Sequence, residues 1–523
     1  MPPEPEPTAP IKNRSKNVAK RLIIVGAGIA GLSTGCYAQM NGYKTTLLEM
    51  HNIPGGLCTA WKRRGRSSSD GYTFDISMHF LAGSKAGPFH QMWQELGVVN
   101  EDQRFHYHDE VARVESGGKS LSICADPRRL EEQMLALSPA DAKQIKAFIR
   151  LIAGKDMSAM VSLKPAEMAR PLDRLKMLAT LLPSMGTVLK YGKLTLQEFA
   201  QRFQDPFLRD AVRFAVESPG WPMPRFPMVA LAGYCTYAVT EGGVPLGGSQ
   251  GVVFGMAKTY QELGGEIHYQ SRVEDLIVEN DRAVGVRLED GTEHRADPVV
   301  WAADGHTVIY DLLGGRYLDD EIRSVYSDWT PVGSPVQVML GVARDLSQEP
   351  HQIIFEAEHP ITIAGEEHRW MTFRHRCFDP SMAPPGSSVA EVWYATPYEH
   401  WEELARDRAR YKEEKKRITD HTIAELDKRW PGFASQIEVV DVATPATYVR
   451  YTGNWRGSPD GWYRTPENFM KEPLRSLPGL SGFYMVGQWT KPYAGTVESA
   501  LTGRQLIQLL CKWSGRPFVT SAP

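Results

Sequence analysis

The chain has 523 residues, of which 42% are hydrophobic and 23% charged, and its formal net charge is −3 at pH 7. This length predicts two intertwined domains, and the small net charge gives no reason to expect a nucleic-acid partner. The six cysteines stand far apart without a C-x-x-C pair, which disfavours a zinc site and suits a reducing, cytoplasmic location.

The N-terminus, MPPEPEPTAPIKNRSKNVAK, is proline-rich and then basic. It lacks the apolar stretch of a secretory signal, so we expect a disordered tail over residues 1–19. No run of eighteen apolar residues occurs in the sequence, and we therefore expect no membrane-spanning helix. Peripheral attachment to a membrane stays open.

A nucleotide-binding turn follows in VGAGIAG. The predicted strand Leu22–Val25 leads directly into Gly26, Gly28 and Gly31, which match the G-x-G-x-x-G pattern. The first glycine permits a tight turn, the second permits close approach of a pyrophosphate, and the third permits close helix–strand packing. Glu49 closes the next predicted strand, where a carboxylate can accept hydrogen bonds from ribose hydroxyls. The disfavoured alternative is a glycine turn with an incidental glutamate.

A second glycine pair, Gly55–Gly56, follows six residues after Glu49 in HNIPGGLCTAWKRRG. An extended flavin dinucleotide needs a second close approach of the backbone here, so this spacing favours FAD over NAD. The alternative is a plain turn. The basic side chains that could offset phosphate charge are Lys62, Arg63 and Arg64.

The segment GYTFDISMHF places Asp75 and His79 among apolar and aromatic residues. A histidine suits proton transfer because its pKa is near neutral. The alternative is a structural histidine in a core. Asp75 is expected to fix the backbone or His79 rather than to act on a substrate.

Residues 126–236 are predicted to be mainly helical, and methionines are concentrated in their second half. Methionine adapts to lipid but also fills ordinary helix cores. Within this block, residues 170–193 combine an apolar face with basic flanks, which indicates either docking on an anionic membrane or a buried helix with snorkelling lysines. The methionines are Met157, Met160, Met168, Met177, Met185, Met223 and Met228.

Residues 240–315 are predicted to contain strands separated by D-G and E-N-D turns. The glycines of GGVPLGGSQG do not fit a second dinucleotide turn. Electrons would therefore pass to oxygen, a quinone or a diffusible carrier, or the reaction would be redox-neutral. Residues 334–400 contain alternating runs typical of strands. A charged helix with a solvated face is expected over about residues 401–430.

The C-terminal segment SGFYMVGQWTKPYAGTVESALTGRQL predicts a strand, a loop and a helix. Lys491 and Glu498 are candidates for proton transfer, and a structural ion pair between them is the alternative. The aromatic residues Trp455, Trp462 and Tyr463 are expected either to wall a pocket or to pack in a core.

Together these elements predict an α/β fold. A Rossmann-like FAD-binding domain is assembled from the discontinuous segments 20–125, 240–330 and 478–523. Residues 126–239 and 331–477 form a mixed-sheet and helical domain that binds substrate and faces the membrane.

The three cofactor segments resemble the phytoene desaturase-like FAD oxidoreductases, within the flavin amine oxidase-like superfamily. This group includes carotenoid desaturases, carotenoid isomerases and retinol saturases, and the resemblance covers nearly the whole chain after residue 20. It implies pyrophosphate contacts from the first glycine turn, ribose contacts after the second strand, and flavin contacts at the last helix. The implied cofactor-binding residues are Gly26, Ala27, Gly28, Gly31, Glu49, Met50, Gly55, Gly56, Leu57, Val273, Gly487, Gln488, Thr496 and Val497.

The chain departs from many carotenoid desaturases, which have G-G-R where this sequence has G-G-L-C and G-T-H-P-G where it has GQWTKPYAG. His79 lies near the G-I-H-Y position of the saturase branch. The resemblance implies desaturation, saturation or double-bond isomerisation of a polyene, isoprenoid or related lipid, with His79, Lys491 and Glu498 as catalytic candidates. The alternatives are an oxygen-dependent flavin amine oxidase and a non-enzymatic prenyl-binding protein similar to the Rab escort proteins.

Overall fold

The structure is a computed structural model of the chain. None of the helices that it describes combines the length and the apolar character that crossing a bilayer requires. The described residues are 20–66, 70–153, 162–172, 175, 179, 182, 185–235, 241–471, 475–492 and 495–521.

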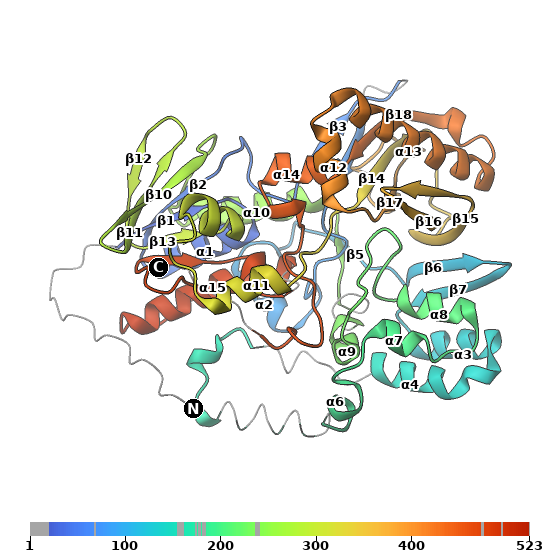
Figure 1. Cartoon of the computed structure of the whole chain (residues 1–523), viewed down its shortest axis with the longest axis horizontal. Coiled ribbons are helices and arrows are strands. Elements are labelled where there is room, and N and C mark those ends of the chain that lie inside the picture. Colours follow the sequence, from blue (N-terminus) through green and yellow to red (C-terminus); the bar gives the residue numbers. More distant parts are fainter. Residues whose placement is uncertain are drawn as a thin grey trace.

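A five-stranded parallel sheet forms the centre of one half of the molecule (Figure 1). Its strand order is β19-β13-β1-β2-β9, so strands from three distant parts of the sequence lie side by side. The predicted strand at residue 22 and the predicted C-terminal strand are both confirmed. The strands are β1 (Arg21–Val25), β2 (Lys44–Leu48), β9 (Glu266–His268), β13 (Val299–Trp301) and β19 (Phe483–Met485).

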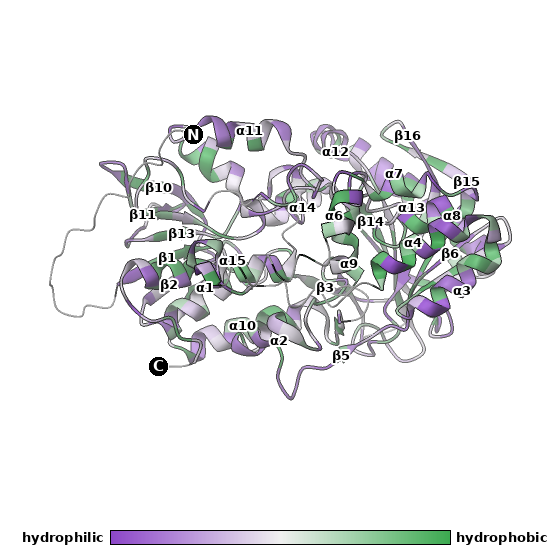
Figure 2. Cartoon of the chain, turned by 90° about the horizontal axis from the view of Figure 1, so that it is seen from below, coloured by the Kyte–Doolittle hydropathy of each residue, from purple (hydrophilic) through white to green (hydrophobic). Residues whose placement is uncertain are grey.

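Helices α1 (Ile29–Met40), α10 (Gly248–Glu262) and α15 (Thr496–Trp513) pack together in one hydrophobic core with this sheet. Every residue of α1 is buried, which is typical of a helix enclosed by other elements rather than one lying at a surface. In Figure 2 strands β1 and β13 are largely hydrophobic, as this enclosed position requires. Nearby lie α2 (Gly87–Glu95) and α11 (Asp320–Asp328).

A small antiparallel sheet extends this half and confirms the strands predicted over residues 240–315. It is built from two successive hairpins, in the order β10-β11-β12. Its strands are β10 (Val273–Glu279), β11 (Arg282–Leu288) and β12 (Glu293–Arg295).

A seven-stranded mixed sheet forms the second half, in the order β18-β14-β17-β16-β15-β6-β7. Only the β15–β6 pairing is parallel. Strands β6 and β7 belong to this sheet, although the sequence analysis assigned residues up to 125 to the cofactor half. They join it because β6 pairs with β15, which is remote in sequence. The strands are β6 (Glu110–Ser116), β7 (Lys119–Cys124), β14 (Val336–Val342), β15 (Gln352–Ile363), β16 (Glu366–His375), β17 (Ser388–Tyr394) and β18 (Ile437–Ala443).

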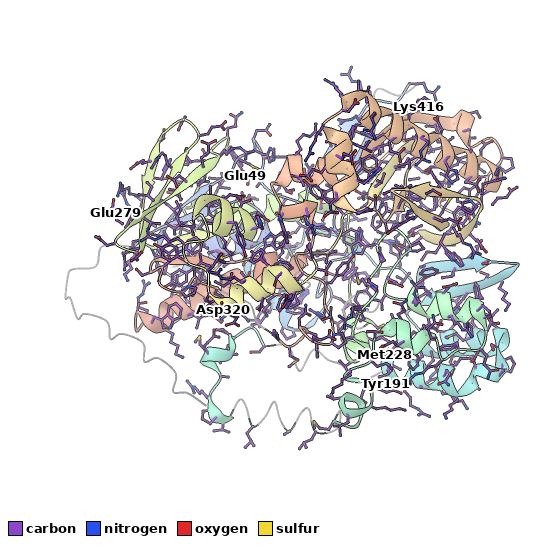
Figure 3. The ribbon with its side chains drawn as sticks, viewed as in Figure 1. Glu49, Tyr191, Met228, Glu279, Asp320 and Lys416 are labelled. Carbon is purple, nitrogen blue, oxygen red and sulfur yellow. The ribbon has the colours of Figure 1, made fainter. Side chains whose placement is uncertain are left out.

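Short helices pack beside β6 and β7 and form a separate hydrophobic core (Figure 1). Their helical character confirms the prediction for this block where the chain is described. Met228 and Tyr191 lie together in this region (Figure 3), and both are buried. The helices are α3 (Pro127–Leu137), α4 (Ala142–Ile152), α6 (Met185–Tyr191), α7 (Leu196–Ala200), α8 (Pro206–Arg213) and α9 (Leu231–Tyr234).

The charged helix expected near residues 401–430 is present as α12 (Tyr398–Ala405) and α13 (Arg408–Arg429). Its outer face is solvated, while Ile418 and Leu426 are buried in the core of the seven-stranded sheet. The remaining elements are β3 (Ala60–Arg63), β4 (Tyr72–Asp75), β5 (Phe105–His106), β8 (Val244–Pro245) and α14 (Pro445–Thr452).

Candidate functional site: two cavities that meet at Asp460

A cavity of about 290 Å³ opens where β1, β2, β13 and β19 end. The carboxyl ends of parallel strands are the usual ligand-binding edge of an open α/β sheet. The lining residues come from all three segments that the sequence assigned to the cofactor. They include Val25, Gly26, Gly28, Leu48, Glu49, Met50, Gly55, Gly56, Leu57, Val273, Trp301, Asp304, Asp460, Val486, Gly487, Gln488 and Thr496.

The glycine turn has the geometry that each of its glycines was expected to permit. Gly26 has a φ of +101°, which favours glycine. A Cβ atom on Gly31 would lie 1.9 Å from the carbonyl oxygen of Gly26, so only glycine lets helix α1 start this close to the turn. A Cβ atom on Gly28 would meet nothing within 4 Å and would project into open space beside the cavity.

Glu49 lies at the end of β2 in the cofactor half (Figure 3). Its side chain is 5% exposed, and its carboxylate accepts hydrogen bonds from the backbone N–H groups of Ala27 and His51, at 2.8 and 2.9 Å. These bonds hold the carboxylate against the glycine turn and at the cavity wall. The group is therefore a fixed acceptor of hydrogen bonds.

The second glycine pair lies directly beside the first turn. Gly55 donates its N–H to the Ala27 carbonyl at 2.9 Å and forms a parallel β-bridge with Gly28. Gly55 and Gly56 have φ values of +132° and +58°. Two turns that are separate in sequence thus form one glycine-lined wall.

The C-terminal segment closes the other side of the cavity. Gly487, Gln488 and Thr496 line it, whereas Val497 packs into the hydrophobic core behind it. Helices α1 and α15 both begin at a glycine N-cap without a side-chain capping bond, and both beginnings reach the cavity. Free N–H groups at helix starts favour anionic groups.

The residues present therefore fit an FAD-type dinucleotide. Two uncapped helix starts suit its phosphates and its electron-accepting ring, and the fixed carboxylate suits a ribose. Met50 and Val273 line the cavity as the sequence indicated, while Ala27 and Gly31 lie just behind its wall. Asp304 also lines it, accepts hydrogen bonds from the N–H groups of Trp455 and Thr307, and has its pKa raised to about 6 by burial.

A second cavity, of about 130 Å³, lies between the helical block and the seven-stranded sheet. Its wall combines apolar and aromatic side chains with several polar ones. The lining residues are His79, Phe80, His108, Val111, Ala112, Ile123, Phe214, Ala215, Val216, Glu217, Ser218, Trp221, Met223, Tyr234, His351, Gln352, Arg374, Trp393 and Asp460.

His79 lines this second cavity and does not line the first. Its Nδ1 atom lies 2.7 Å from Nη1 of Arg374, and its ring packs against Trp393 with a centroid distance of 4.6 Å. Burial, together with Arg374 and Arg376, holds the pKa of His79 well below its ordinary value. The imidazole is therefore neutral near pH 7.

Asp460 is the residue that lines both cavities, and the sequence reasoning missed it. Burial raises the pKa of its carboxyl to about 6, and no hydrogen bond to this side chain occurs within the described part of the chain. Its Oδ1 atom lies 3.7 Å from where a Cβ atom on Gly495, the N-cap of α15, would stand. The surrounding P-D-G is a common turn pattern, and nothing local marks the carboxylate as buried.

The other two catalytic candidates do not line either cavity. Lys491 and Glu498 form an ion pair at 3.6 Å, with side chains 19% and 25% exposed. This contact corresponds to the structural alternative that the sequence left open.

Asp75 and the aromatic residues near position 460 were the other residues singled out in the sequence. Asp75 accepts bonds from the N–H of Ser77 and from both the N–H and the hydroxyl of Ser249, so it fixes the backbone at the start of α10 rather than contacting His79. Trp462 is fully buried in an aromatic cluster with Trp489, and it lines neither cavity. Trp455 and Tyr463 likewise line neither cavity.

Among the methionines, Met223 lines the second cavity and Met228 is buried in the helical core. Met168 is partly buried, and Met185 is 41% exposed. Met157, Met160 and Met177 lie outside the described residues, as does much of the segment 170–184.

Comparison with known proteins agrees with this geometry. Residues 29–505 match the family described as flavin containing amine oxidoreductase. The chain is 25% identical to a chloroplastic prolycopene isomerase of Daucus carota over 506 residues, covering 92% of this chain and 78% of that protein. It is 26% identical to a lycopene-forming phytoene desaturase of Pseudescherichia vulneris over 501 residues, covering 91% of this chain and 96% of that protein.

Solved structures share the fold at lower identity. An oxidoreductase from Methanosarcina mazei superposes with a TM-score of 0.59 at 16% identity, covering 93% of this chain and all of that one. A putrescine oxidase bound to putrescine gives a TM-score of 0.60 at 12% identity, covering 95% of this chain and 99% of that one. The predicted superfamily, fold class and cofactor are confirmed. The chain belongs to the flavin-containing amine oxidoreductase family and is an FAD-dependent oxidoreductase.

Proposed function

We propose that this oxidoreductase transforms carbon–carbon bonds of a long apolar, conjugated substrate by desaturation, saturation or double-bond isomerisation. The observation that carries the proposal is the shared wall at Asp460, where the cofactor cavity meets a second, largely apolar cavity. The similarity to a phytoene desaturase and a prolycopene isomerase supports the same class of reaction.

The residues of the first cavity would hold FAD along its length. The start of α1, with Gly26 and Gly28, would hold the pyrophosphate, and Glu49 would accept hydrogen bonds from the ribose. Gly487 and Gln488 would contact the chain that leads to the ring, and the start of α15 at Thr496 would face the ring itself. When bound, FAD would supply a group that can accept or donate a hydride.

Asp460 is the best-placed group for moving a proton. A carboxyl with a pKa of about 6 is close to balanced between its acid and base forms near neutral pH, which favours proton transfer. Desaturation requires a proton to leave the substrate next to the carbon that loses a hydride, and saturation requires the reverse. Asp460 at the junction of the two cavities would accept that proton in one direction and donate it in the other.

The second cavity would orient the substrate and exclude water. Phe214, Val216 and Met223 are buried side chains that present apolar surface to it. Nδ1 of His79 accepts a hydrogen bond from Arg374, so the ring would present only its Nε2–H to the cavity. His79 would therefore donate a hydrogen bond to the substrate and would not accept a proton from it.

Oxidation of an amine is the second candidate, because solved structures with this fold include putrescine oxidase. Arg374 argues against it, since a buried guanidinium on the wall of the second cavity would repel a protonated amine. A purely lipid-binding role like that of the Rab escort proteins is disfavoured, because the glycine turns, Glu49 and the start of α15 together line a cavity suited to FAD.

Peripheral membrane contact fits the segment around α6. Its exposed apolar side chains include Leu182, Val188 and Leu189, which are 62%, 43% and 81% exposed, next to the cations Lys190 and Lys193. An apolar surface with basic neighbours suits an anionic bilayer, from which an apolar substrate would enter.

The test is an anaerobic incubation of the FAD-loaded protein with a panel of carotenes, shorter polyenes and primary amines. We expect bleaching of flavin absorbance, or an isomerised product, with polyenes only. A product lighter by two hydrogens, heavier by two, or of equal mass identifies the direction. Peroxide formation with amines, and no change of any polyene, would refute the proposal.

A further inference from the structure

The second cavity contains a buried positive charge that a hydrocarbon substrate would not need. Arg374, on β16, is 8% exposed and lines this cavity. Burial lowers the pKa of its guanidinium to about 10, so it still carries a charge near pH 7. Its Nη1 donates to neutral His79, and its guanidinium stacks 4.8 Å from the ring of Trp393.

No carboxylate of the described part of the chain forms an ion pair with Arg374 within 4.0 Å. Glu391 stands opposite Arg374 on β17 and attracts it, but its Oε2 accepts instead from Gln337, at 3.4 Å. The undescribed stretch after Cys235, residues 236–240, has the sequence TYAVT and carries no acidic side chain. A buried charge with no described carboxylate within ion-pair distance is unfavourable, which suggests that a ligand completes the pair.

Other lining side chains also have polar atoms without partners. Within the described residues, these atoms are Nε of Arg374, Nε1 of Trp393, Oγ of Ser218, Nδ1 of His351 and Nε2 of His108. Trp393 is 3% exposed, and its indole nitrogen is a donor only. Buried polar atoms are almost always paired in native proteins, so this concentration of orphans in one cavity indicates a polar ligand.

Two of these atoms, Nε of Arg374 and Nε1 of Trp393, can only donate hydrogen bonds, and they select the chemistry of that ligand. An arginine fork and an indole N–H match an ionised carboxylate, which only accepts hydrogen bonds. The rest of the wall, including Ile123, Phe214 and Val216, is apolar and suits a hydrocarbon chain.

We propose that the second cavity binds the carboxylate of an amphipathic substrate, a polyene or polyunsaturated fatty acid, with Arg374 as its counter-ion and Trp393 as a further donor. That this acid is then a substrate rests on the proposed reaction at carbon–carbon bonds. It narrows the substrate class from hydrocarbons to apolar acids. Binding of the acid end would also fix which carbons reach Asp460 at the junction of the cavities.

The test compares an acid with its methyl ester, which removes the charge and keeps the chain. Retinoic acid and arachidonic acid, each with its ester, are titrated into the FAD-loaded protein below their aggregation concentrations. Quenching of tryptophan fluorescence measures binding without requiring turnover, because Trp221 and Trp393 line the cavity. We expect at least one acid to bind about thirtyfold more tightly than its ester, as lost charge-assisted hydrogen bonds predict.

Arg374→Gln should remove that difference, lowering acid affinity about thirtyfold and leaving ester affinity within threefold. Arg374→Lys keeps the positive charge but loses the two parallel N–H donors of the guanidinium. It should therefore show part of the wild-type preference for the acid over the ester. Arg410→Gln on the solvated face of α13 is the matched control and should change neither affinity. If Arg374→Gln does not fold, Trp393→Phe keeps a ring and removes only the N–H, and it should weaken the acid selectively by about fivefold.

Equal binding of acid and ester by the wild-type protein would overturn the inference. So would loss of both ligands alike in folded Arg374→Gln, or an unchanged acid preference in that variant. Selective acid binding with no flavin bleaching, no isomerisation and no new product would instead refute the proposed reaction and leave the binding inference intact. Turnover of carotenes with no binding of any acid would refute the inference and leave the reaction intact.

Discussion

Nη1 of Arg374 donates a hydrogen bond of 2.7 Å to Nδ1 of His79, across 295 residues of sequence. Arginine has no lone pair to offer, so the histidine nitrogen must be the acceptor and the ring proton must lie on Nε2. His79, which the sequence offered as a proton carrier, is therefore a neutral hydrogen-bond donor at the wall of the second cavity.

We therefore expect His79→Gln to act on binding. The substitution should raise KM for the substrate about tenfold and change kcat less than threefold, because one neutral hydrogen bond is lost. Steady-state kinetics over pH 5–9 measures both constants, with Arg410→Gln as the control. A fall in kcat of a hundredfold or more, with substrate binding unchanged, would instead make His79 the proton carrier.

Asp460→Asn should remove the group that moves the proton. We expect the rate of flavin bleaching, or of isomerisation, to fall about 100- to 10,000-fold while FAD content is retained. In the oxidation direction the wild-type rate should rise with pH through about 6, as the carboxyl ionises and becomes a base. The titratable side chains that Asp460 influences are Cys58, Tyr234, Tyr448 and Tyr463, whose pKa values are all raised, so they stay protonated there.

The same residue predicts how stability depends on pH. The pKa is higher in the folded state than the ordinary value of about 3.9, so the protonated carboxyl favours folding. The contribution of Asp460 to the free energy of unfolding is therefore greatest below about pH 4, is lost as pH rises to about 6, and changes little above that. Thermal unfolding at pH 4 to 7 should show a steeper decline for the wild-type protein than for Asp460→Asn. Identical slopes would contradict the burial of this carboxyl.

Two glycines of one turn should respond differently to the same substitution. Gly31→Ala places a Cβ atom 1.9 Å from a backbone oxygen and should lower Tm by several degrees or prevent folding. Gly28→Ala meets nothing within 4 Å, so the fold should be kept while FAD affinity falls about tenfold or more.

The measurements are thermal unfolding of the apoprotein and flavin absorbance after reconstitution. Gly333→Ala is the control, because a Cβ atom there also meets nothing within 4 Å and the residue does not line the cofactor cavity. FAD content of Gly28→Ala equal to that of the wild type would show that the pyrophosphate does not approach this residue.

Lys491 and Glu498 should behave as a structural pair. A double-mutant cycle of Lys491→Met and Glu498→Gln should give a coupling of about 0.5 kcal/mol in the free energy of unfolding, as for partly exposed ion pairs. Each single variant should keep kcat within threefold of the wild type. A large loss of kcat in folded, FAD-loaded Lys491→Met would return this lysine to the catalytic candidates.

The cofactor cradle could be predicted because its information is local. Gly26, Gly28 and Gly31 serve one turn, and Glu49 closes the very next strand, so spacing along the chain nearly determines spacing in space. Apolar runs and turn signals likewise predicted the strands, and apolar residues at helical spacing predicted the last helix. The boundary at residue 125 was less predictable, because β6 and β7 join their sheet through β15, more than 200 residues away.

The substrate side was decided only by the tertiary structure. Asp460 stands in a P-D-G sequence that is typical of an exposed turn, and its burial arises from packing between two halves of the molecule. Arg374 and His79 lie on segments whose local patterns say nothing about their contact. The sequence by itself determined the class of fold and its FAD site, because turn chemistry and strand periodicity act between near neighbours. Which side chains share a buried cavity depends on long-range packing, and that packing sets their charge, their hydrogen-bond partners and their part in the chemistry.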